Sequence, residues 1–231
     1  MSLVYLIPAP LDDKQLEPIP AYVLTAIKAC AVLFVENERT ARRYLKKLDP
    51  SIVIDDYEWH TIHKAEQEVK QKFIHAVQQK KTIGIISEAG CPGIADPGQV
   101  LVQTAHELGA TVKPLTGPSS ILLAVMASGL NGQQFSFVGY LPVDELQRKR
   151  KLQQLEELSQ KLKSTQIFIE TPYRNNQLLE TILKTCKTST KLCIAADLTG
   201  ANEMIGTKTI AQWKQSIPDL HKRPVIFCLL G

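Results

Sequence analysis

The stretch from Ser87 to Gly98 constrains the fold more than any other part of this chain. It reads Ser-Glu-Ala-Gly-Cys-Pro-Gly-Ile-Ala-Asp-Pro-Gly, and its two prolines and three glycines continue neither a helix nor a strand. The apolar run 83–86 before it predicts a buried strand, and the residues 99–108 after it have the apolar spacing of a helix that ends at Gly109. A strand, a glycine-rich turn and a helix in this order indicate an α/β fold.

The 87–98 loop is also a candidate ligand site. Ligands of open α/β sheets bind at the carboxyl ends of the strands, and glycine lets the backbone approach a ligand closely. We expect Asp96 to cap the following helix, with Pro97 at its first position. Local composition alone leaves open the alternative that the loop is a tight connection that binds nothing.

The remaining apolar runs predict two α/β domains. Further strands are expected at 3–7, 31–35, 52–54, 110–114, 135–140, 166–170, 191–196, 204–207 and 225–230. Tight links join several of the later strands, which favours a mixed sheet in the second half and a mainly parallel sheet in the first. We therefore expect an N-terminal domain over residues 1–116 and a C-terminal domain over residues 117–231.

Composition narrows the class of protein. The net charge of +4 over 231 residues permits a polyanionic partner, yet it is far from the charge of a dedicated nucleic-acid binder. The five cysteines are scattered without CxxC spacing, which predicts neither a zinc site nor a disulfide framework and fits a reducing cytoplasm. We expect no signal peptide, since Pro8 interrupts the first apolar run, and no membrane span.

Charged residues follow the predicted strand 31–35. Glu36 and Arg39 come directly after it, at the same sheet edge as the 87–98 loop, and Arg39 and Arg43 share one helix face. Guanidinium groups bind phosphates well, although such a run is more often a solvated helix face. His60 and His63 do not predict a metal site, because no carboxylate or cysteine spacing completes a ligand set.

A second candidate ligand loop runs from Thr116 to Ser119. It precedes a segment of small and apolar residues up to Leu130, in which Ser119 or Ser120 is expected to cap a helix. The low polarity of this helix suits a position between layers or at a domain junction.

Several of these segments resemble one known family. Ser87–Gly98 resembles the S-D-A-G-T-P-x-I-x-D-P-G signature of the tetrapyrrole-methylase-like (class III) methyltransferases. Other segments resemble, in order, motifs of the branch of the ribosomal RNA small subunit methyltransferases I. They are 35–43 (A-E-D-T-R-H-T-R-R), 114–119 (P-x-P-G-P-S), 129–142 (G-L-P-x-x-x-F-x-F-x-G-F-L-P), 168–174 (F-Y-E-S-P-H-R) and 195–203 (A-R-E-L-T-K-x-x-E).

The resemblance implies a fold, a cofactor and partners. It implies two α/β domains with S-adenosylmethionine in the cleft between them, S-adenosylhomocysteine as the product, and a homodimer. It also implies methyl transfer to a ribose 2′-hydroxyl of small-subunit (16S) ribosomal RNA. The cofactor-binding positions that it implies are Pro8, Pro10, Leu11, Ser87, Ala89, Gly90, Ile94, Ala95, Gly117, Pro118, Ser119, Thr171, Asp197, Leu198 and Thr199.

Methyl transfer to a ribose requires polar groups of the kind that this sequence places at the ends of predicted strands. The protein must align acceptor and methyl donor, and a ribose hydroxyl needs a base or a charge-stabilising group nearby. Candidates for that group are Glu36, Glu170 and Asp197, and candidates for flanking phosphates are Arg39, Arg43 and Arg174. We predict a catalytic set of Glu36, Arg39, Glu170 and Arg174, with structural salt bridges as the alternative role.

The sequence departs from the branch motifs at a few positions and leaves two other functions open. Asn37 and Glu38 replace the aspartate and threonine of E-D-T-R, and Ala196 replaces the arginine of A-R-E-L-T. A methylase of this fold acting on a small molecule such as a tetrapyrrole fits the mild positive charge and the end of the chain at Gly231. A non-catalytic RNA or ribosome-assembly binder fits the substitutions Asn37 and Glu38.

Overall fold

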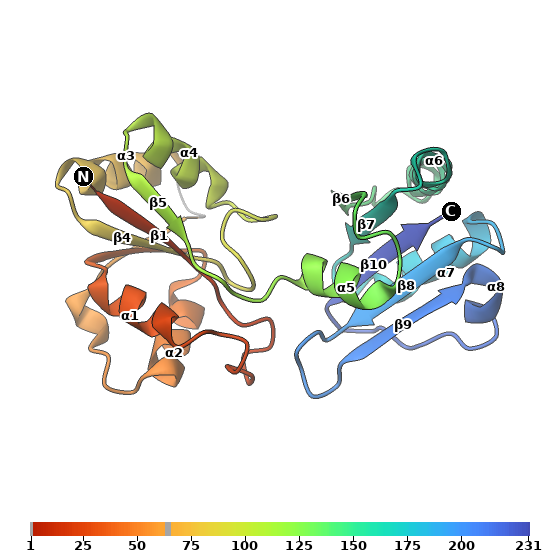
Figure 1. The fold of residues 1–231 in the computed structure, drawn as a ribbon, viewed down its shortest axis with the longest axis horizontal. Coiled ribbons are helices and arrows are strands. Elements are labelled where there is room, and N and C mark those ends of the chain that lie inside the picture. Colours follow the sequence, from red (N-terminus) through yellow and green to blue (C-terminus); the bar gives the residue numbers. More distant parts are fainter. Residues whose placement is uncertain (1, 63–65) are drawn as a thin grey trace. The chain divides into compact units, whose positions relative to one another are not determined.

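The computed structural model describes residues 2–62 and 66–231, which form two compact units. The chain divides between Ser119 and Ser120, a few residues after the boundary expected from the sequence (Figure 1). Each unit has its own sheet and its own buried core.

The N-terminal domain is built on a parallel five-stranded sheet of order β3-β2-β4-β1-β5. Its strands are β1 (Leu3–Ile7), β2 (Val32–Val35), β3 (Glu58–Thr61), β4 (Thr82–Ile86) and β5 (Thr111–Pro114). Its helices are α1 (Tyr22–Ala29), α2 (Glu38–Leu48), α3 (Glu66–Gln78) and α4 (Gln99–Glu107), with a 3-10 turn at Ile54–Asp56. A purely parallel sheet is expected from strands that are apolar on both faces.

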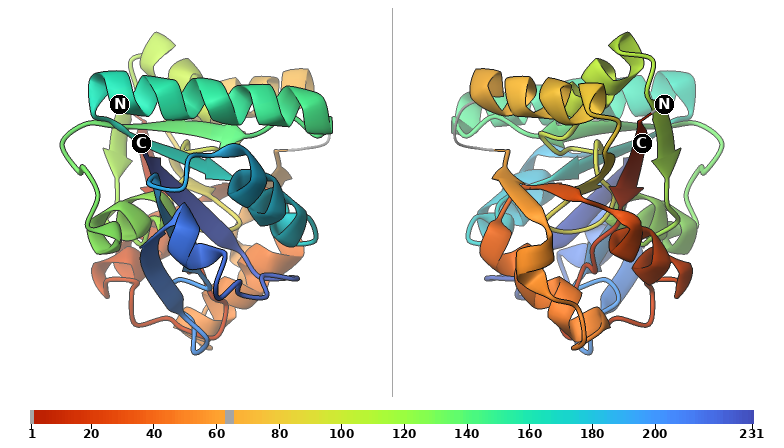
Figure 2. Two further views of the ribbon diagram at one scale, coloured as in Figure 1. Left: turned by 90° about the vertical axis from the view of Figure 1, so that its right-hand side faces the viewer. Right: turned by 90° about the vertical axis from the view of Figure 1, so that its left-hand side faces the viewer.

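Helices cover both faces of this sheet. Val23 and Leu45, from α1 and α2, pack with Leu33 on one face, and Phe73 of α3 packs with Phe34 and Ile83 on the other. Figure 1 shows α1 and α2 on one side of the sheet and α3 and α4 on the opposite side, and the right-hand view of Figure 2 looks onto the same domain. Both cores confirm the expected α/β architecture of this half.

One predicted strand is wrong. The run 52–54 does not form a strand, because Ile52 is buried against the core of the α1–α2 face and Ile54 begins the 3-10 turn. The strand lies instead at β3, whose backbone pairs with β2 and whose Trp59 Nε1 donates to the Ile54 carbonyl at 2.9 Å. The polar residues Glu58 and His60 give β3 no apolar pattern in the sequence, because an edge strand is defined by backbone pairing more than by apolar side chains.

The C-terminal domain has the mixed sheet that the sequence predicts, in the order β6-β7-β10-β8-β9. The pair β6–β7 is parallel and the other three pairs are antiparallel. Its strands are β6 (Phe135–Tyr140), β7 (Thr165–Ile169), β8 (Lys191–Ala196), β9 (Met204–Thr209) and β10 (Val225–Leu230). Its helices are α5 (Ser120–Ser128), α6 (Glu145–Leu162), α7 (Asn175–Thr185) and α8 (Ile210–Trp213), seen in the left-hand view of Figure 2.

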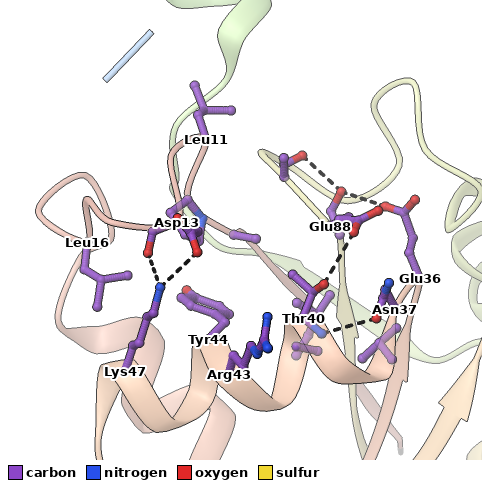
Figure 3. Close-up of a pocket in the computed structure, with 17 residues that line it drawn as sticks. Leu11, Asp13, Leu16, Glu36, Asn37, Thr40, Arg43, Tyr44, Lys47 and Glu88 are labelled. Atoms are coloured by element: carbon purple, nitrogen blue, oxygen red, sulfur yellow. Dashed lines mark hydrogen bonds and ion pairs between the residues drawn. The ribbon is translucent and has the colours of Figure 1, made fainter. Parts of the chain in front are cut away.

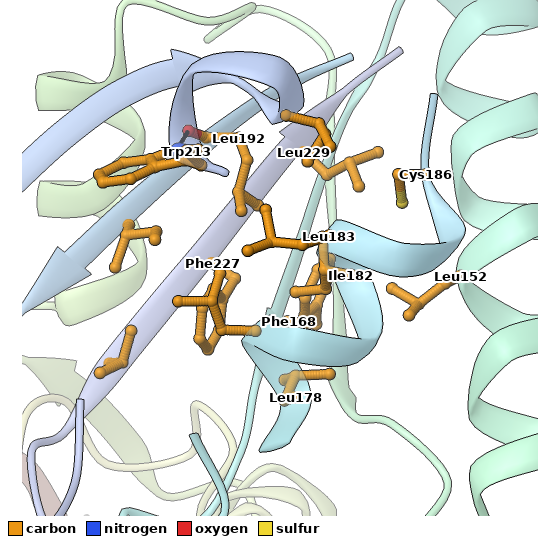
Figure 4. Packing of buried hydrophobic residues seen from close by; sticks show 14 of the residues in the cluster. Leu152, Phe168, Leu178, Ile182, Leu183, Cys186, Leu192, Trp213, Phe227 and Leu229 are labelled. Carbon is orange, nitrogen blue, oxygen red and sulfur yellow. Dashed lines mark hydrogen bonds between the residues drawn. The ribbon is translucent and has the colours of Figure 1, made fainter. Parts of the chain in front are cut away.

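Aromatic and branched side chains fill the core of this second domain (Figure 4). The rings of Phe168 and Phe227 stack with centroids 5.8 Å apart between β7 and β10, and Ile182 and Leu183 of α7 pack beside them. Each such side chain contributes about 1.5–3 kcal/mol by leaving water. The packing of this core therefore supports the strand ends that carry the predicted motif residues.

No helix in the described part of the chain is long and apolar enough to cross a membrane.

Candidate functional site

Three predicted cofactor loops of the N-terminal domain lie together. Strands β4, β1 and β5 are neighbours and parallel, so the loops that follow them leave from one edge of the sheet. Ala9 and Gly90 exchange two backbone hydrogen bonds, of 2.9 and 3.0 Å. The Cys91 thiol lies 3.8 Å from the Gly117 carbonyl and 3.5 Å from that of Pro118. The predicted positions in these three loops thus form one assembly.

Close backbone approach requires small residues in this assembly. A Cβ atom at Gly117 would lie 2.1 Å from the Cβ of Pro8, so any other residue would collide with the proline ring. Gly90 has a φ of +78°, and Ala95 holds a left-handed φ of +55° that costs an alanine conformational energy. Such strained residues persist where the surrounding structure holds them, and they cluster at ligand sites.

Two tyrosines hold these loops from the flanking helices. The Tyr44 hydroxyl of α2 donates to the Pro8 carbonyl at 2.8 Å, and burial raises the pKa of Tyr44, which keeps it a neutral donor. The Tyr22 hydroxyl of α1 accepts from the Thr116 backbone N–H at 2.6 Å. Sequence reasoning missed both, because no motif of the sequence includes either tyrosine.

A cavity of about 180 Å³ opens beside the loops, between the segment after β1 and helix α2 (Figure 3). The predicted site residues that line it are Pro10, Leu11, Glu36, Ser87 and Ala89. The other polar and charged residues of its wall are Asp13, Asn37, Thr40, Arg43, Tyr44, Lys47 and Glu88. Apart from Arg43, none of these was predicted as a site residue. The predicted positions Pro8, Arg39, Gly90, Ile94, Ala95, Gly117, Pro118 and Ser119 do not line the cavity.

Glu36 is the carboxyl group at the centre of the polar contacts of this site. Its Oε1 accepts from the Ser87 hydroxyl at 3.1 Å and from the Glu88 backbone N–H at 2.9 Å. Burial, and next a hydrogen bond shared with Asp96, raise the pKa of Glu36 above its usual value. The buried Asp96 Oδ2 receives no donor from the described residues, so the two carboxyl groups can bond only when one carries a proton.

The expected helix cap at Asp96 is wrong in one respect. Asp96 Oδ1 accepts from the backbone N–H groups of Gly93 at 3.2 Å and Gly98 at 2.6 Å, both inside the loop. Gly98, not Asp96, is the N-cap of α4. The carboxylate therefore closes the loop on itself instead of starting the helix.

Helix α2 begins at a cap that departs from the family motif. The side chain of Asn37 accepts from the backbone N–H groups of Arg39 at 3.0 Å and Thr40 at 3.2 Å, which explains an asparagine here. Arg39 and Arg43 are both exposed on this helix, and Arg43 alone of the two reaches the cavity. Asn37 thus caps the helix, and its presence in place of the family's aspartate does not imply a loss of function.

The predicted residues of the C-terminal domain meet at one edge of its sheet. Thr171 follows β7 and Asp197 follows β8, and both strands flank β10. The Asp197 backbone N–H donates to the Pro224 carbonyl at 3.0 Å, and the Arg223 Nε donates to Asp197 Oδ2 at 2.6 Å. Arg223 lies far from the other motif residues in the sequence, which gives no sign of this role.

The two predicted carboxylates of this domain, Glu170 and Asp197, are each paired with an arginine. Glu170 Oε1 is buried and accepts from the Thr171 backbone N–H at 2.6 Å and from Arg174 Nε and Nη2 at 3.1 and 2.7 Å. Asp197 Oδ2 accepts from Arg223 Nε, while Arg223 Nη2 donates to the Asn202 carbonyl at 2.7 Å. Glu36 instead contacts a hydroxyl, an amide and a second carboxyl group, which is the arrangement of a group that can accept a proton.

The loop after β8 has the features of a ligand contact. Asp197 and Thr199 hold left-handed φ angles of +51° and +68°, and a β-branched residue rarely adopts this conformation. The Thr199 hydroxyl is buried and has no hydrogen-bond partner in the described residues. An orphaned hydroxyl of this kind can donate to a neutral, polar group of a ligand.

Metal ligands do not gather in the described part of the chain, where no group of three or more histidine, cysteine or acidic residues is placed to hold an ion. His60 Nε2 lies 2.8 Å from Glu58 Oε1. His63 lies outside the described residues.

Comparison with known sequences relates this chain to a family of methyltransferases. A model of the family Tetrapyrrole (Corrin/Porphyrin) Methylases matches residues 4–213. Ribosomal RNA small subunit methyltransferase I of Halalkalibacterium halodurans is 31% identical over 180 residues, 78% of this chain and 59% of that protein. The proteins of the same name from Vibrio cholerae and Mesorhizobium japonicum are each 30% identical; the matches cover 91% and 98% of this chain and 69% and 74% of theirs.

Solved structures show the same fold. The methyltransferase CobJ superposes with a TM-score of 0.65 at 14% identity, over all of this chain and 94% of that one. Uroporphyrin-III-C-methyltransferase from Thermus thermophilus superposes with a TM-score of 0.57 at 14% identity, over 99% and 92% of the two chains. The chain therefore belongs to the tetrapyrrole (corrin/porphyrin) methylase family of methyltransferases and, within it, to the kind represented by ribosomal RNA small subunit methyltransferase I.

Proposed function

We propose that this protein uses S-adenosylmethionine to methylate a ribose 2′-hydroxyl of small-subunit (16S) ribosomal RNA. The observation that carries the proposal is the position of Glu36, a carboxyl group with a raised pKa in a cavity that shares Pro10, Leu11, Ser87 and Ala89 with the proposed cofactor loops. The printed names of the relatives support ribosomal RNA as the acceptor.

The cofactor would be held mainly by backbone groups and small side chains. In the N-terminal domain these belong to residues 8–11, 87–95 and 117–119, which form the interlocked loop assembly. In the C-terminal domain Thr171, Asp197, Leu198 and Thr199 would contribute, with Arg223 holding Asp197 in place. When bound, S-adenosylmethionine supplies the electrophilic methyl group on its sulfonium. The protein therefore needs mainly to position the two reactants and to exclude water from them, and needs less to activate the methyl group.

Glu36 is the proposed proton acceptor for the ribose hydroxyl. A general base works best when its pKa lies near the working pH, and burial together with the contact to Asp96 moves Glu36 in that direction. Ser87 and Glu88 keep the carboxyl group in one orientation through their bonds to Oε1. The proton of the ribose hydroxyl would pass to the Glu36 carboxylate as the hydroxyl oxygen takes the methyl group, with S-adenosylhomocysteine as the leaving group.

Arginines are the proposed contacts to flanking phosphates. Arg39 and Arg43 are exposed on α2, and Arg174 is partly exposed after β7. Glu170 would act as a positioning residue, since it binds Arg174 through both Nε and Nη2. Phosphate contacts of this kind fix the register of an RNA without reading its bases.

We also propose a cytoplasmic homodimer, supported by the family resemblance of the motifs. Light scattering behind size exclusion would measure the mass of the particle, and a monomer of the 25.7 kDa chain would reject the dimer.

The experiment that tests the function is transfer of a labelled methyl group to small ribosomal subunits from a strain lacking the gene. Label in the RNA that survives alkaline hydrolysis as a 2′-O-methylated dinucleotide supports the proposal. Transfer to a tetrapyrrole but not to RNA would establish a small-molecule methylase. Tight RNA binding without transfer, and without S-adenosylhomocysteine binding by calorimetry, would establish a non-catalytic binder.

A further inference from the structure

Lys47 and Asp13 meet at the end of the cavity remote from Glu36 (Figure 3). The Lys47 Nζ donates to the Asp13 backbone carbonyl at 2.6 Å and to its carboxylate Oδ2 at 3.1 Å. The bond joins the end of α2 to the segment after β1, one on each side of the cavity. The sequence motifs single out neither residue.

Four of the five basic residues of α2 fall into two groups. Arg42 pairs with Glu38 and lies over the Trp59 ring, and Lys46 donates to the Pro50 carbonyl at 3.0 Å. Neither lines the cavity. Arg43 and Lys47 stand one helical turn apart and both line it. They form one cationic wall of the cavity, whereas Arg42 and Lys46 make the other contacts described.

The Lys47–Asp13 ion pair is weak enough for another anion to replace the Asp13 carboxylate. The Asp13 side chain is 75% exposed and that of Lys47 42% exposed, and an ion pair in water adds little to stability. A backbone phosphate carries the same charge as the Asp13 carboxylate, on two non-bridging oxygens, and a second cation, Arg43, stands on the same wall. Exchanging the carboxylate for a phosphate therefore costs the fold little.

We propose that Lys47 exchanges Asp13 for a backbone phosphate of the acceptor RNA, which then binds beside Arg43 in this cavity. The inference rests on the proposed function and assigns the cavity to the acceptor strand. Asp13 is the internal competitor for the phosphate, and Lys47 is a binding residue. Glu36, the proposed proton acceptor, lies at the other end of the cavity.

Fluorescence anisotropy with a small-subunit ribosomal RNA transcript over a series of salt concentrations tests this assignment. Lys47→Ala is expected to weaken binding roughly fivefold and to reduce the slope of log K against log salt by about 0.7–0.9, one phosphate contact. Lys46→Ala is the matched control. It removes the same charge from the adjacent position of the same helix, outside the cavity, and is expected to leave the slope nearly unchanged.

Asp13→Asn is expected to change RNA affinity in the opposite direction from Lys47→Ala, and a misfolded protein would not bind RNA more tightly. Loss of the competing charge is expected to tighten RNA binding about twofold to threefold. Asp12→Asn, the adjacent residue, whose carboxylate caps the Lys14 backbone N–H at 2.9 Å, is the matched control. In the Lys47→Ala background Asp13→Asn should have no effect, because the competition then has no lysine to release.

Two results would overturn the inference: equal salt slopes for Lys47→Ala and Lys46→Ala, or an effect of Asp13→Asn that persists without Lys47. Calorimetry with S-adenosylhomocysteine separates these outcomes from failure of the proposed function. A wild-type protein that binds both S-adenosylhomocysteine and RNA, with indistinguishable lysine variants, refutes only the phosphate assignment. A wild-type protein that binds neither refutes the function itself.

Discussion

Gly117 approaches Pro8 so closely that a Cβ atom at Gly117 would lie 2.1 Å from the proline Cβ and 2.5 Å from its Cγ. This contact locks the loop after β5 to the loop after β1. The proline ring cannot rotate aside as a flexible side chain would, because it is closed onto its own backbone nitrogen, and the Tyr44 hydroxyl holds the Pro8 carbonyl. The spacing of two proposed cofactor loops therefore depends on one missing methyl group.

Gly117→Ala is expected to lower the free energy of unfolding by about 1–3 kcal/mol, the usual cost of overpacking, and to weaken S-adenosylhomocysteine binding. Gly132→Ala is the control, since its Cβ would meet only a Val125 methyl at an ordinary 3.7 Å. Chemical denaturation and calorimetry measure the two quantities. A Gly117→Ala protein as stable and as tightly binding as Gly132→Ala would contradict the locked-loop arrangement.

Tyr44→Phe removes the hydrogen bond to the buried Pro8 carbonyl and leaves the ring in place. We expect a loss of about 1–2 kcal/mol in unfolding free energy and a higher KM for S-adenosylmethionine, because the carbonyl loses its partner and its loop is released. Tyr57→Phe removes a hydroxyl that bonds no described residue, and should change neither value. An unchanged KM in Tyr44→Phe would show that the loop keeps its position without the tyrosine.

Glu36→Gln is expected to stabilise the protein increasingly as pH rises, while abolishing most of its activity. Glutamine resembles the protonated acid, which the fold favours because burial and the contact with Asp96 raise the pKa of Glu36. The stability that the wild-type carboxyl contributes is complete below its ordinary pKa of 4.5 and is lost as pH rises through the raised value. Unfolding free energies of both proteins across this range would test it, and parallel pH curves would count against a shared proton.

Arg174→Ala is expected to destabilise the protein by about 2–4 kcal/mol, because the buried Glu170 carboxylate loses the partner of two hydrogen bonds. Adding Glu170→Gln to Arg174→Ala should recover part of this loss by removing the uncompensated charge. Denaturant titration of the single and double variants measures the coupling. A double variant less stable than Arg174→Ala would mean that the carboxylate does not depend on the arginine.

Local patterns predicted most of the elements because the buried strands are continuous apolar runs, as at Val32–Val35 and Val225–Leu230. The same criterion failed at β3, where Glu58 and His60 occupy an edge strand that only backbone pairing with β2 defines. The cap of α4 was misplaced because the carboxylate of Asp96 can bond its own loop as readily as a helix end.

The candidate site shows the same division. Motifs located Glu36 and the glycine loops, because those residues act through identity and spacing along the chain. Tyr44, Lys47 and Arg223 escaped notice, because each acts across a long sequence distance on a loop that it meets only in the folded domain. No local pattern encodes such a contact.

The sequence by itself determined the family, the two α/β domains and the loops proposed to bind the cofactor, since apolar periodicity and glycine-rich motifs are local properties of the chain. Only the tertiary structure decided which side chains share a cavity, which carboxylates an arginine neutralises and which carboxyl group has its pKa raised by burial. These properties arise from distances between strands and helices far apart in sequence, and from burial, which changes the free energy of a charge only once the chain has folded around it.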